Sequence, residues 1–182
     1  MAPPATIHRI RVDLSDVERG VYEELDFRVA RHPSESIRYL LTRTLAYCLS
    51  YQDGLTFSKA GLHTAEEPPL AVHDPTGRLL TWIDVGSPSA ERLHKASKAA
   101  GRVIIYTHSP LLALRAEAGS IHKSSAIEVV TLDASLLDSL EPHVDRQMDL
   151  GLTRNEGQLY LTLGEHTFES TLQQDRLRGE PS

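Results

Sequence analysis

The chain has 182 residues, of which 40% are hydrophobic and 24% are charged, and its formal net charge is −6. This composition excludes a disordered polymer, and the negative charge argues against a dedicated coat for duplex DNA, which depends on Lys and Arg. No apolar run approaches the roughly 18 to 20 residues of a membrane span, so we expect no membrane partner. The single cysteine, Cys48, excludes an internal disulfide and favours a cytoplasmic location. The length predicts one domain over residues 1–182.

Hydrophobic periodicity predicts strands and helices along the whole chain. In order, we expect an antiparallel hairpin (6–14 and 21–30), a first helix from residues 32–36 to Gly54, a short strand (55–59), two strands joined by a turn (68–72 and 79–84), a helix started by Ser87 and Pro88, an apolar strand (103–106), a short helix (110–119), a strand (126–132), a short helix (136–140), a hairpin (144–152 and 158–163) and a last strand (167–172). Strand 103–106 should run parallel to strand 79–84, because a helix connects them. The polar residues from 173 onward are expected to fray.

The order of helix, three strands, helix and strand, with acids before the second strand and at the end of the third, resembles the core of restriction-endonuclease-like nucleases. More closely, the chain resembles the YaeQ family over nearly its whole length. The segments that carry this likeness are 5–7, 30–35, 57–62, 67–68, 80–88, 92–96, 149–150 and 157–161. The resemblance implies an α/β fold with a restriction-endonuclease-like central mixed sheet flanked by helices. An N-terminal hairpin, which would pair with or cover that sheet, and C-terminal strands would be additions to this core.

A metal-dependent nuclease needs carboxylates that converge on Mg²⁺ or Mn²⁺, which then polarises the scissile phosphate and activates a water. Glu67 and Asp84 are the candidate metal ligands. Their separation of 17 positions (84 − 67) suits neighbouring strands. The resemblance places them on the two acids of the PD-(D/E)-x-K signature, with Glu35 as a supporting acid. Each also has a structural explanation: Glu67 as a loop acid, Asp84 as a turn former at a strand end, and Glu35 as an acid matching a helix dipole.

The lysine of the signature should lie two residues after Asp84, where this chain has Gly86. Lys95 on the following helix and Lys59 at the end of a strand are the candidate replacements. Such a lysine would orient the attacking water or stabilise developing charge. The alternatives are a solvated helix lysine and an edge-strand lysine.

Arg38, Arg43 and Arg92 are candidates for a rim that binds the phosphates of a nucleic acid, although ordinary solvated surface is the simpler explanation. Two functions therefore stay open. The first is a Mg²⁺-dependent nuclease with a variant signature. The second is a noncatalytic nucleic-acid- or protein-binding protein that keeps the nuclease fold, as Gly86 and the negative charge suggest. A third possibility is an interaction module that uses the edge of the C-terminal hairpin.

Overall fold

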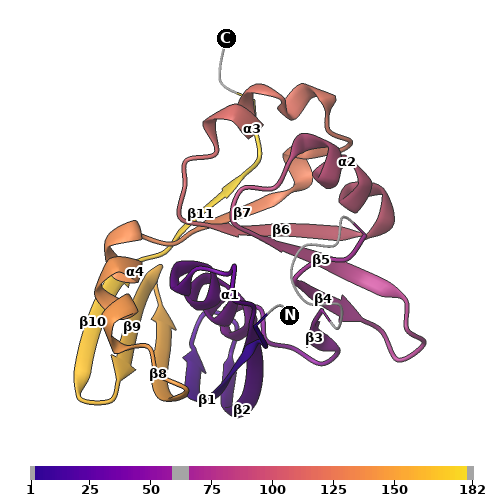
Figure 1. Cartoon of the computed structure of the whole chain (residues 1–182). Coiled ribbons are helices and arrows are strands. Elements are labelled where there is room, and N and C mark those ends of the chain that lie inside the picture. Colours follow the sequence, from indigo (N-terminus) through magenta and orange to yellow (C-terminus); the bar gives the residue numbers. More distant parts are fainter. Residues whose placement is uncertain (1–2, 59–65, 180–182) are drawn as a thin grey trace. The chain divides into compact units, whose positions relative to one another are not determined.

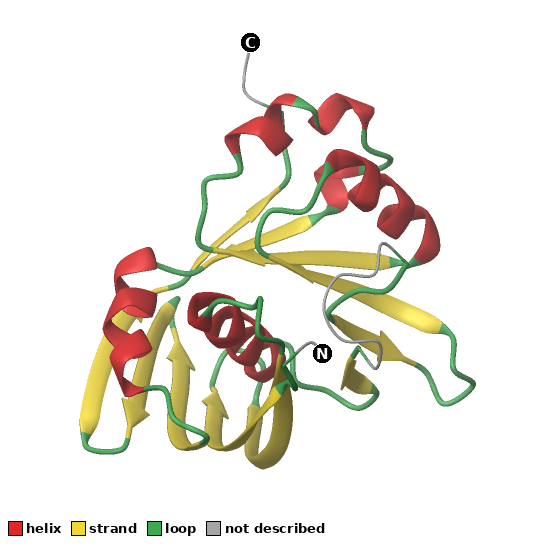
Figure 2. Ribbon diagram, in the orientation of Figure 1, coloured by secondary structure: helices red, strands yellow, loops and turns green. Residues whose placement is uncertain are grey.

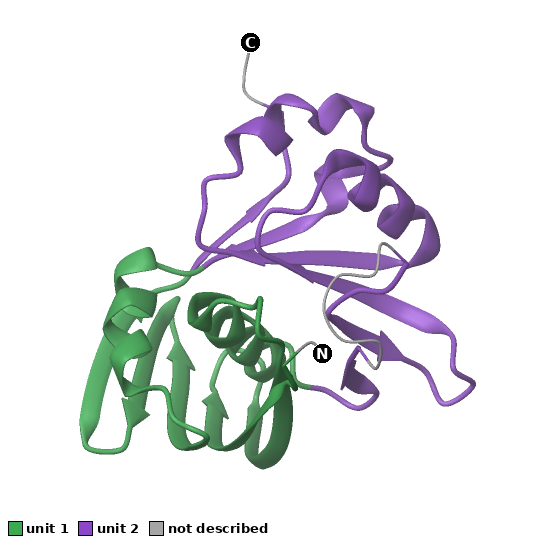
Figure 3. Cartoon of the chain, in the orientation of Figure 1, with its two compact units in different colours: residues 1–51, 132–172 green, residues 52–131, 173–182 purple. Residues whose placement is uncertain are grey.

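The computed structural model describes residues 3–58 and 66–179. The chain forms two compact units (Figure 3): unit 1 contains residues 1–51 and 132–172, and unit 2 contains residues 52–131 and 173–182. Each unit has one mixed sheet and a few helices, so the fold is mixed α/β (Figures 1 and 2). Among the helices of the described ranges, none is long and apolar enough to span a membrane.

Unit 1 is built on a five-stranded sheet in the order β10-β9-β8-β1-β2. Its elements are β1 (Thr6–Asp16), β2 (Val21–Arg31), α1 (Ile37–Leu49), α4 (Ala134–Leu140), β8 (Gln147–Asn155), β9 (Gln158–Leu163) and β10 (His166–Thr171). The two predicted hairpins, β1–β2 and β8–β9, are both confirmed as antiparallel pairs. They join through the pairing of β1 with β8, which is parallel. One residue in two along β1, β8 and β9 is buried, so this sheet has one apolar face and one exposed face.

Unit 2 is built on a six-stranded sheet in the order β11-β7-β6-β5-β4-β3. Its elements are β3 (Leu55–Phe57), β4 (Leu70–His73), β5 (Leu79–Val85), α2 (Ala90–Ala99), β6 (Arg102–Thr107), α3 (Leu112–Ala116), β7 (Glu128–Thr131) and β11 (Gln173–Arg176). The predicted parallel pairing of β5 with β6 is confirmed. The apolar run of β6 is buried along its length, as a central strand of a parallel sheet requires.

Both long helices begin later than the sequence predicts. The side chain of Ser36 accepts a hydrogen bond from the backbone N–H of Tyr39, so α1 starts at Ile37 and Glu35 precedes the helix. Ser89 caps α2 in the same way through Arg92, instead of the predicted Ser87. Two serines precede each helix, and the one that caps it lies directly before the first helical turn.

The sheets differ from the sequence-based expectations in two respects. The N-terminal hairpin does not pair with the central sheet, because the hairpin and the C-terminal strands form a separate five-stranded sheet of their own. Residues 173–176, which were expected to fray, form β11 instead and pair antiparallel with β7. Leu177 follows β11 and is fully buried in the apolar cluster of unit 2. The burial of this one leucine explains why a polar segment is held against the sheet.

Candidate functional site

Asp84 occupies a buried position near the end of β5 and has only 3% of its surface exposed. Because alternate residues of a strand share a face, Trp82 points to the same side as Asp84. The indole Nε1 of Trp82 donates a hydrogen bond of 2.8 Å to Oδ2 of Asp84. A side chain of the same strand therefore fixes the position of the carboxylate.

Arg92 supplies the positive charge that this buried carboxylate requires. It lies in the first turn of α2, and its Nε is 2.9 Å from Oδ1 and 3.0 Å from Oδ2 of Asp84. The guanidinium also lies 5.2 Å from the centre of the Trp82 ring, within range of a cation–π contact. A second nitrogen, Nη2, donates 2.8 Å to the backbone carbonyl of Glu67. One arginine thus ties together α2, β5 and the residues that lead into β4.

Glu67 reaches this centre through its backbone, while its side chain has a different partner. Oε2 of Glu67 accepts a hydrogen bond of 2.9 Å from Oγ of Ser58, and the residue is exposed. The structure therefore brings the two predicted metal ligands to the same guanidinium. In this arrangement only Asp84 contributes its carboxylate.

These side chains do not fit a divalent cation as they stand. Both oxygens of Asp84 already accept hydrogen bonds from Arg92 and Trp82. Within residues 3–58 and 66–179, no group of three or more His, Cys, Asp or Glu side chains is arranged to hold a metal ion. A guanidinium bound to both oxygens and a hard cation would compete for the same lone pairs.

The predicted lysines give no added support to a metal site. Gly86 adopts a φ of +92°, a conformation in which a lysine would be strained. Lys95 has 60% of its side chain exposed and pairs across one helical turn with Glu91, 3.4 Å away. Lys59 lies outside the described residues.

The remaining predicted site residues belong to unit 1. Glu35 is buried, with only 4% of its surface exposed, and Nη2 of Arg43 lies 2.9 Å from its Oε1. Burial raises the pKa of Glu35 above its ordinary value, and the charge of Arg43 partly opposes that rise. Arg38 binds Asp138 and Glu141 of the same unit. All three predicted phosphate-binding arginines, Arg92 included, are thus paired with carboxylates of their own unit.

Sequence reasoning missed two partners in the centre around Asp84. They are Trp82 and Ser58, neither of which was among the predicted site residues. The spacing Trp82-x-Asp84 on a strand was a usable signal, because it places the indole beside the acid. Ser58 carries no comparable signal, because β3 and Glu67 meet only through the fold.

Comparison with known proteins extends these observations to the whole chain. The sequence model of a family described as YaeQ protein matches residues 1–172. The chain belongs to the YaeQ family. It is 27% identical over 175 residues to the "Uncharacterized protein YaeQ" of Escherichia coli K12, covering 94% of this chain and 96% of that one. The protein of the same description from Salmonella typhi has the same identity and coverage.

Two crystal structures of YaeQ proteins have the same fold. The YaeQ protein of Pseudomonas syringae has a TM-score of 0.84 and 29% identity, over 98% of this chain and 99% of that one. The YaeQ protein of Xanthomonas axonopodis pv. citri has a TM-score of 0.84 and 26% identity, over 96% of this chain and 99% of that one. The mixed α/β architecture is therefore that of YaeQ proteins.

Proposed function

We propose that this YaeQ protein is a noncatalytic binding protein built on a restriction-endonuclease-like core, and that its partner is a protein rather than a nucleic acid. The observation that carries the proposal is the contact of the Arg92 guanidinium with both oxygens of Asp84. In a nuclease of this kind the second acid of the signature faces a metal ion. Here an internal cation holds that acid.

The order α1, β3, β4, β5, α2 and β6 supports the restriction-endonuclease-like part of the proposal, because it matches the expected sequence of core elements. The loss of the signature lysine to Gly86 supports the noncatalytic part. A cytoplasmic location belongs to the same proposal, since the one cysteine, Cys48, is buried and has no other cysteine to pair with.

The choice of a protein partner follows from the charges. Arg38, Arg43 and Arg92 each bind a carboxylate of the chain, so binding a phosphate would cost those ion pairs. The net charge of −6 adds a general repulsion toward a polyanion. Tight nucleic-acid binding depends on free Lys and Arg that displace counterions from phosphates.

A Mg²⁺- or Mn²⁺-dependent nuclease is the second candidate, and one observation favours it. The same guanidinium contacts the carboxylate of Asp84 and the backbone of Glu67, so both expected ligands belong to one centre. This function would require Arg92 to leave Asp84 and the side chain of Glu67 to leave Ser58.

The deciding experiment combines metal binding with cleavage. The purified protein is titrated with Mn²⁺ and Mg²⁺ by calorimetry, and is then incubated with single-stranded, duplex and branched DNA and with RNA. We expect neither metal binding at the Asp84 centre nor cleavage. Cleavage that disappears in Asp84→Ala would establish the nuclease and overturn the proposal. A mobility-shift assay at about 0.15 M salt, where nonspecific Kd values are typically micromolar or weaker, tests nucleic-acid binding without cleavage.

A double-mutant cycle tests the structural role of the ion pair. Asp84→Ala and Arg92→Ala should each lower the free energy of unfolding by about 3 kcal/mol, because each leaves a largely buried charge without its partner. The double variant should cost clearly less than the sum of the two. The exposed pair Lys95–Glu91 is the matched control, and its removal should change the free energy of unfolding by about 0.5 kcal/mol or less. Additive losses in Asp84 and Arg92 would mean that the pair is not coupled.

A further inference from the structure

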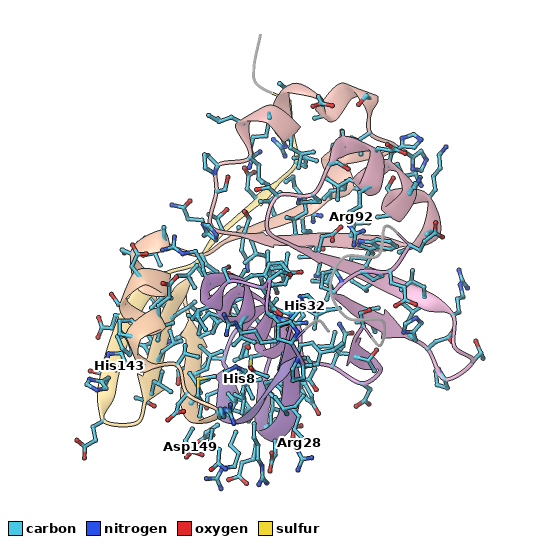
Figure 4. All side chains as sticks on the ribbon, viewed as in Figure 1. His8, Arg28, His32, Arg92, His143 and Asp149 are labelled. Atoms are coloured by element: carbon cyan, nitrogen blue, oxygen red, sulfur yellow. The ribbon has the colours of Figure 1, made fainter. Side chains whose placement is uncertain are left out.

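The exposed face of the unit 1 sheet has a regular arrangement of charges over β1 and β2. Its residues form five rows of two directly opposed residues, here called the β1–β2 face. The rows are Ile7 with Ala30, Arg9 with Arg28, Arg11 with Asp26, Asp13 with Glu24, and Ser15 with Tyr22. All of these except the half-buried Ser15 are exposed. Figure 4 shows Arg28 and Asp149 among the side chains that project from this sheet away from α1.

Three charges of this face are neutralised within the chain, Arg9 of the basic row and both residues of the middle row. Arg9 binds Asp26 through two nitrogens at 3.1 and 2.7 Å, and Arg11 binds Asp149 of β8 at 2.7 and 3.2 Å. Across residues 3–58 and 66–179, the side chains of Asp13, Glu24 and Arg28 form no hydrogen bond or ion pair, and Arg28 acts on the carboxylate of Asp26 only through its charge at longer range.

The rows on either side of the middle place like charges opposite each other. Arg9 faces Arg28 across the strands, and Asp13 faces Glu24. Such pairs are unfavourable within one sheet. The acidic row therefore lowers the stability of the isolated chain, while at the basic row the Arg9–Asp26 ion pair offsets part of the repulsion. An opposite charge brought from outside would stabilise Asp13, Glu24 and Arg28.

Outside the middle row, the face is complementary to itself under one rotation. The residues of the middle row meet their own counterparts, but each is already neutralised within its own chain, Arg11 by Asp149 and Asp26 by Arg9. A half-turn about an axis along the middle row, Arg11 with Asp26, exchanges the basic row with the acidic row. The same rotation exchanges the row of Ile7 and Ala30 with the row of Ser15 and Tyr22. We propose that two copies of this chain pack these faces together as a two-fold symmetric dimer. Glu24 of each copy then meets Arg28 of the other, and Asp13 meets Arg9.

The shape of the surface agrees with this occupant. A hollow of about 570 Å³ lies over the acidic and middle rows, and it is lined by charged side chains and by the backbone between them. These residues are Arg11, Val12, Asp13, Glu24, Leu25, Asp26, Asp149 and Leu150. A guanidinium from the second copy enters such a hollow with its planar donors facing several carboxylates.

The ends of the face supply the apolar part of the contact. Ile7 has 52% and Tyr22 has 62% of its surface exposed, and both belong to the few large apolar residues of the described chain that lie open to solvent. In the dimer the ring of Tyr22 covers Ile7 and Ala30 of the other copy, at both ends of the interface. Sheets that pack face to face with strands nearly aligned, about 30° apart, allow this overlap. Symmetry then uses each contact twice.

A charge exchange tests the dimer. Sedimentation velocity is measured for the wild type, Glu24→Arg, Arg28→Glu and the double variant, from about 1 μM to about 1 mM, a range that brackets moderate Kd values. We expect the wild type to approach twice its 20.2 kDa mass, and less so at high salt. Each single variant should weaken the dimer at least tenfold, or about 1.4 kcal/mol, because it places like charges across the interface. The double variant restores opposite charges and should restore the dimer.

The same single variants carry an internal check on folding. Each removes a like-charge row within its own chain, so neither should lower the melting temperature of the dilute monomer. Lys98→Glu, an exposed change on α2, is the control and should leave association unchanged. A chain that stays monomeric over the whole range overturns the proposal and leaves the face to solvent or to a different protein. The proposal is also overturned if neither single variant weakens the dimer, or if the double variant does not restore it.

Discussion

Two buried carboxylates of this chain are neutralised in the same way, each by an ion pair with an arginine eight positions later. Asp84 at the end of β5 meets Arg92 on α2, and Glu35 before α1 meets Arg43 on α1. In both cases the acid lies just before a helix, and the arginine returns to it from that helix. Buried charges need such partners, because an unpaired ion in the interior is costly.

The burial of Glu35 predicts a pH dependence of stability. Burial raises the pKa of Glu35 above 4.5, and Arg43 only partly opposes this. A raised pKa in the folded state gives stability that is present below the unfolded value and is lost as the pH rises through the folded value. The free energy of unfolding of the wild type relative to Glu35→Gln should therefore fall on going from about pH 4 toward neutrality. Urea unfolding at a series of pH values measures this difference.

Glu128 provides the control of opposite sign. A hydrogen bond from Arg102 lowers the pKa of Glu128 below 4.5. Its contribution should be present above pH 4.5 and lost as the pH falls through the lowered value. The wild type relative to Glu128→Gln should therefore lose stability toward acid. If the stability differences for both glutamates changed with pH in the same direction, burial would not raise the pKa of Glu35 as stated.

At this scale the sequence located Asp84, but it did not reveal what holds Asp84. Arg92 was interpreted as a phosphate-binding residue, because a charged residue on a helix has no visible partner in the sequence. Its pairing depends on how α2 crosses β5 and on the rotamer of a long side chain, neither of which spacing reports. Trp82 was readable in principle, because strand alternation alone places it beside Asp84.

At the scale of elements, alternation predicted strands well wherever one face of a sheet is buried. Both strands of the first hairpin and both strands of β8–β9 are of this kind. The failure is β11, whose four residues are exposed on both faces and carry no alternating pattern. An edge strand of this composition is indistinguishable from a polar tail until its partner strand is known.

The burial of Leu177 anchors β11 to unit 2, and a substitution tests this. Leu177 is fully buried, and its backbone N–H donates 2.9 Å to the carbonyl of Ile127. Leu177→Ala should lower the free energy of unfolding by about 2–5 kcal/mol, because it removes a buried side chain and leaves a cavity. Urea denaturation measures the change. Leu112→Ala is the control, since Leu112 has 61% of its surface exposed and should cost little. Equal effects at both positions would show that β11 is not anchored.

At the scale of the whole molecule, each compact unit is assembled from two separate segments of the chain. The chain passes between the units after residues 51, 131 and 172, so neither unit is complete within one continuous stretch. Pattern reasoning identifies strands but not their neighbours, and this is why one central sheet was expected where two exist. The pairing of β1 with β8 has no local signal, since Arg11 and Asp149 are 138 positions apart.

This interleaving predicts that the chain unfolds in one step, as expected of a single domain over residues 1–182. Loss of either unit removes the anchors of two segments of the other, so partial unfolding gains little chain entropy. In calorimetry the measured enthalpy of unfolding should equal the van't Hoff enthalpy. Two separated transitions, or a calorimetric enthalpy well above the van't Hoff value, would instead mean two domains that fold on their own.

The parallel pairing of β1 with β8 also constrains how the protein folds during its synthesis. The first hairpin leaves the ribosome well before the strand that must lie beside β1, since Arg11 of β1 and its partner Asp149 of β8 are 138 positions apart. Until then Ile10, Val12 and Leu14 present an apolar stripe next to an unpaired strand edge, which is a surface that chaperones and aggregates both recognise. The native sheet of unit 1 therefore cannot be completed until β8 has been translated, and we expect it to form slowly, as in other chains dominated by distant contacts.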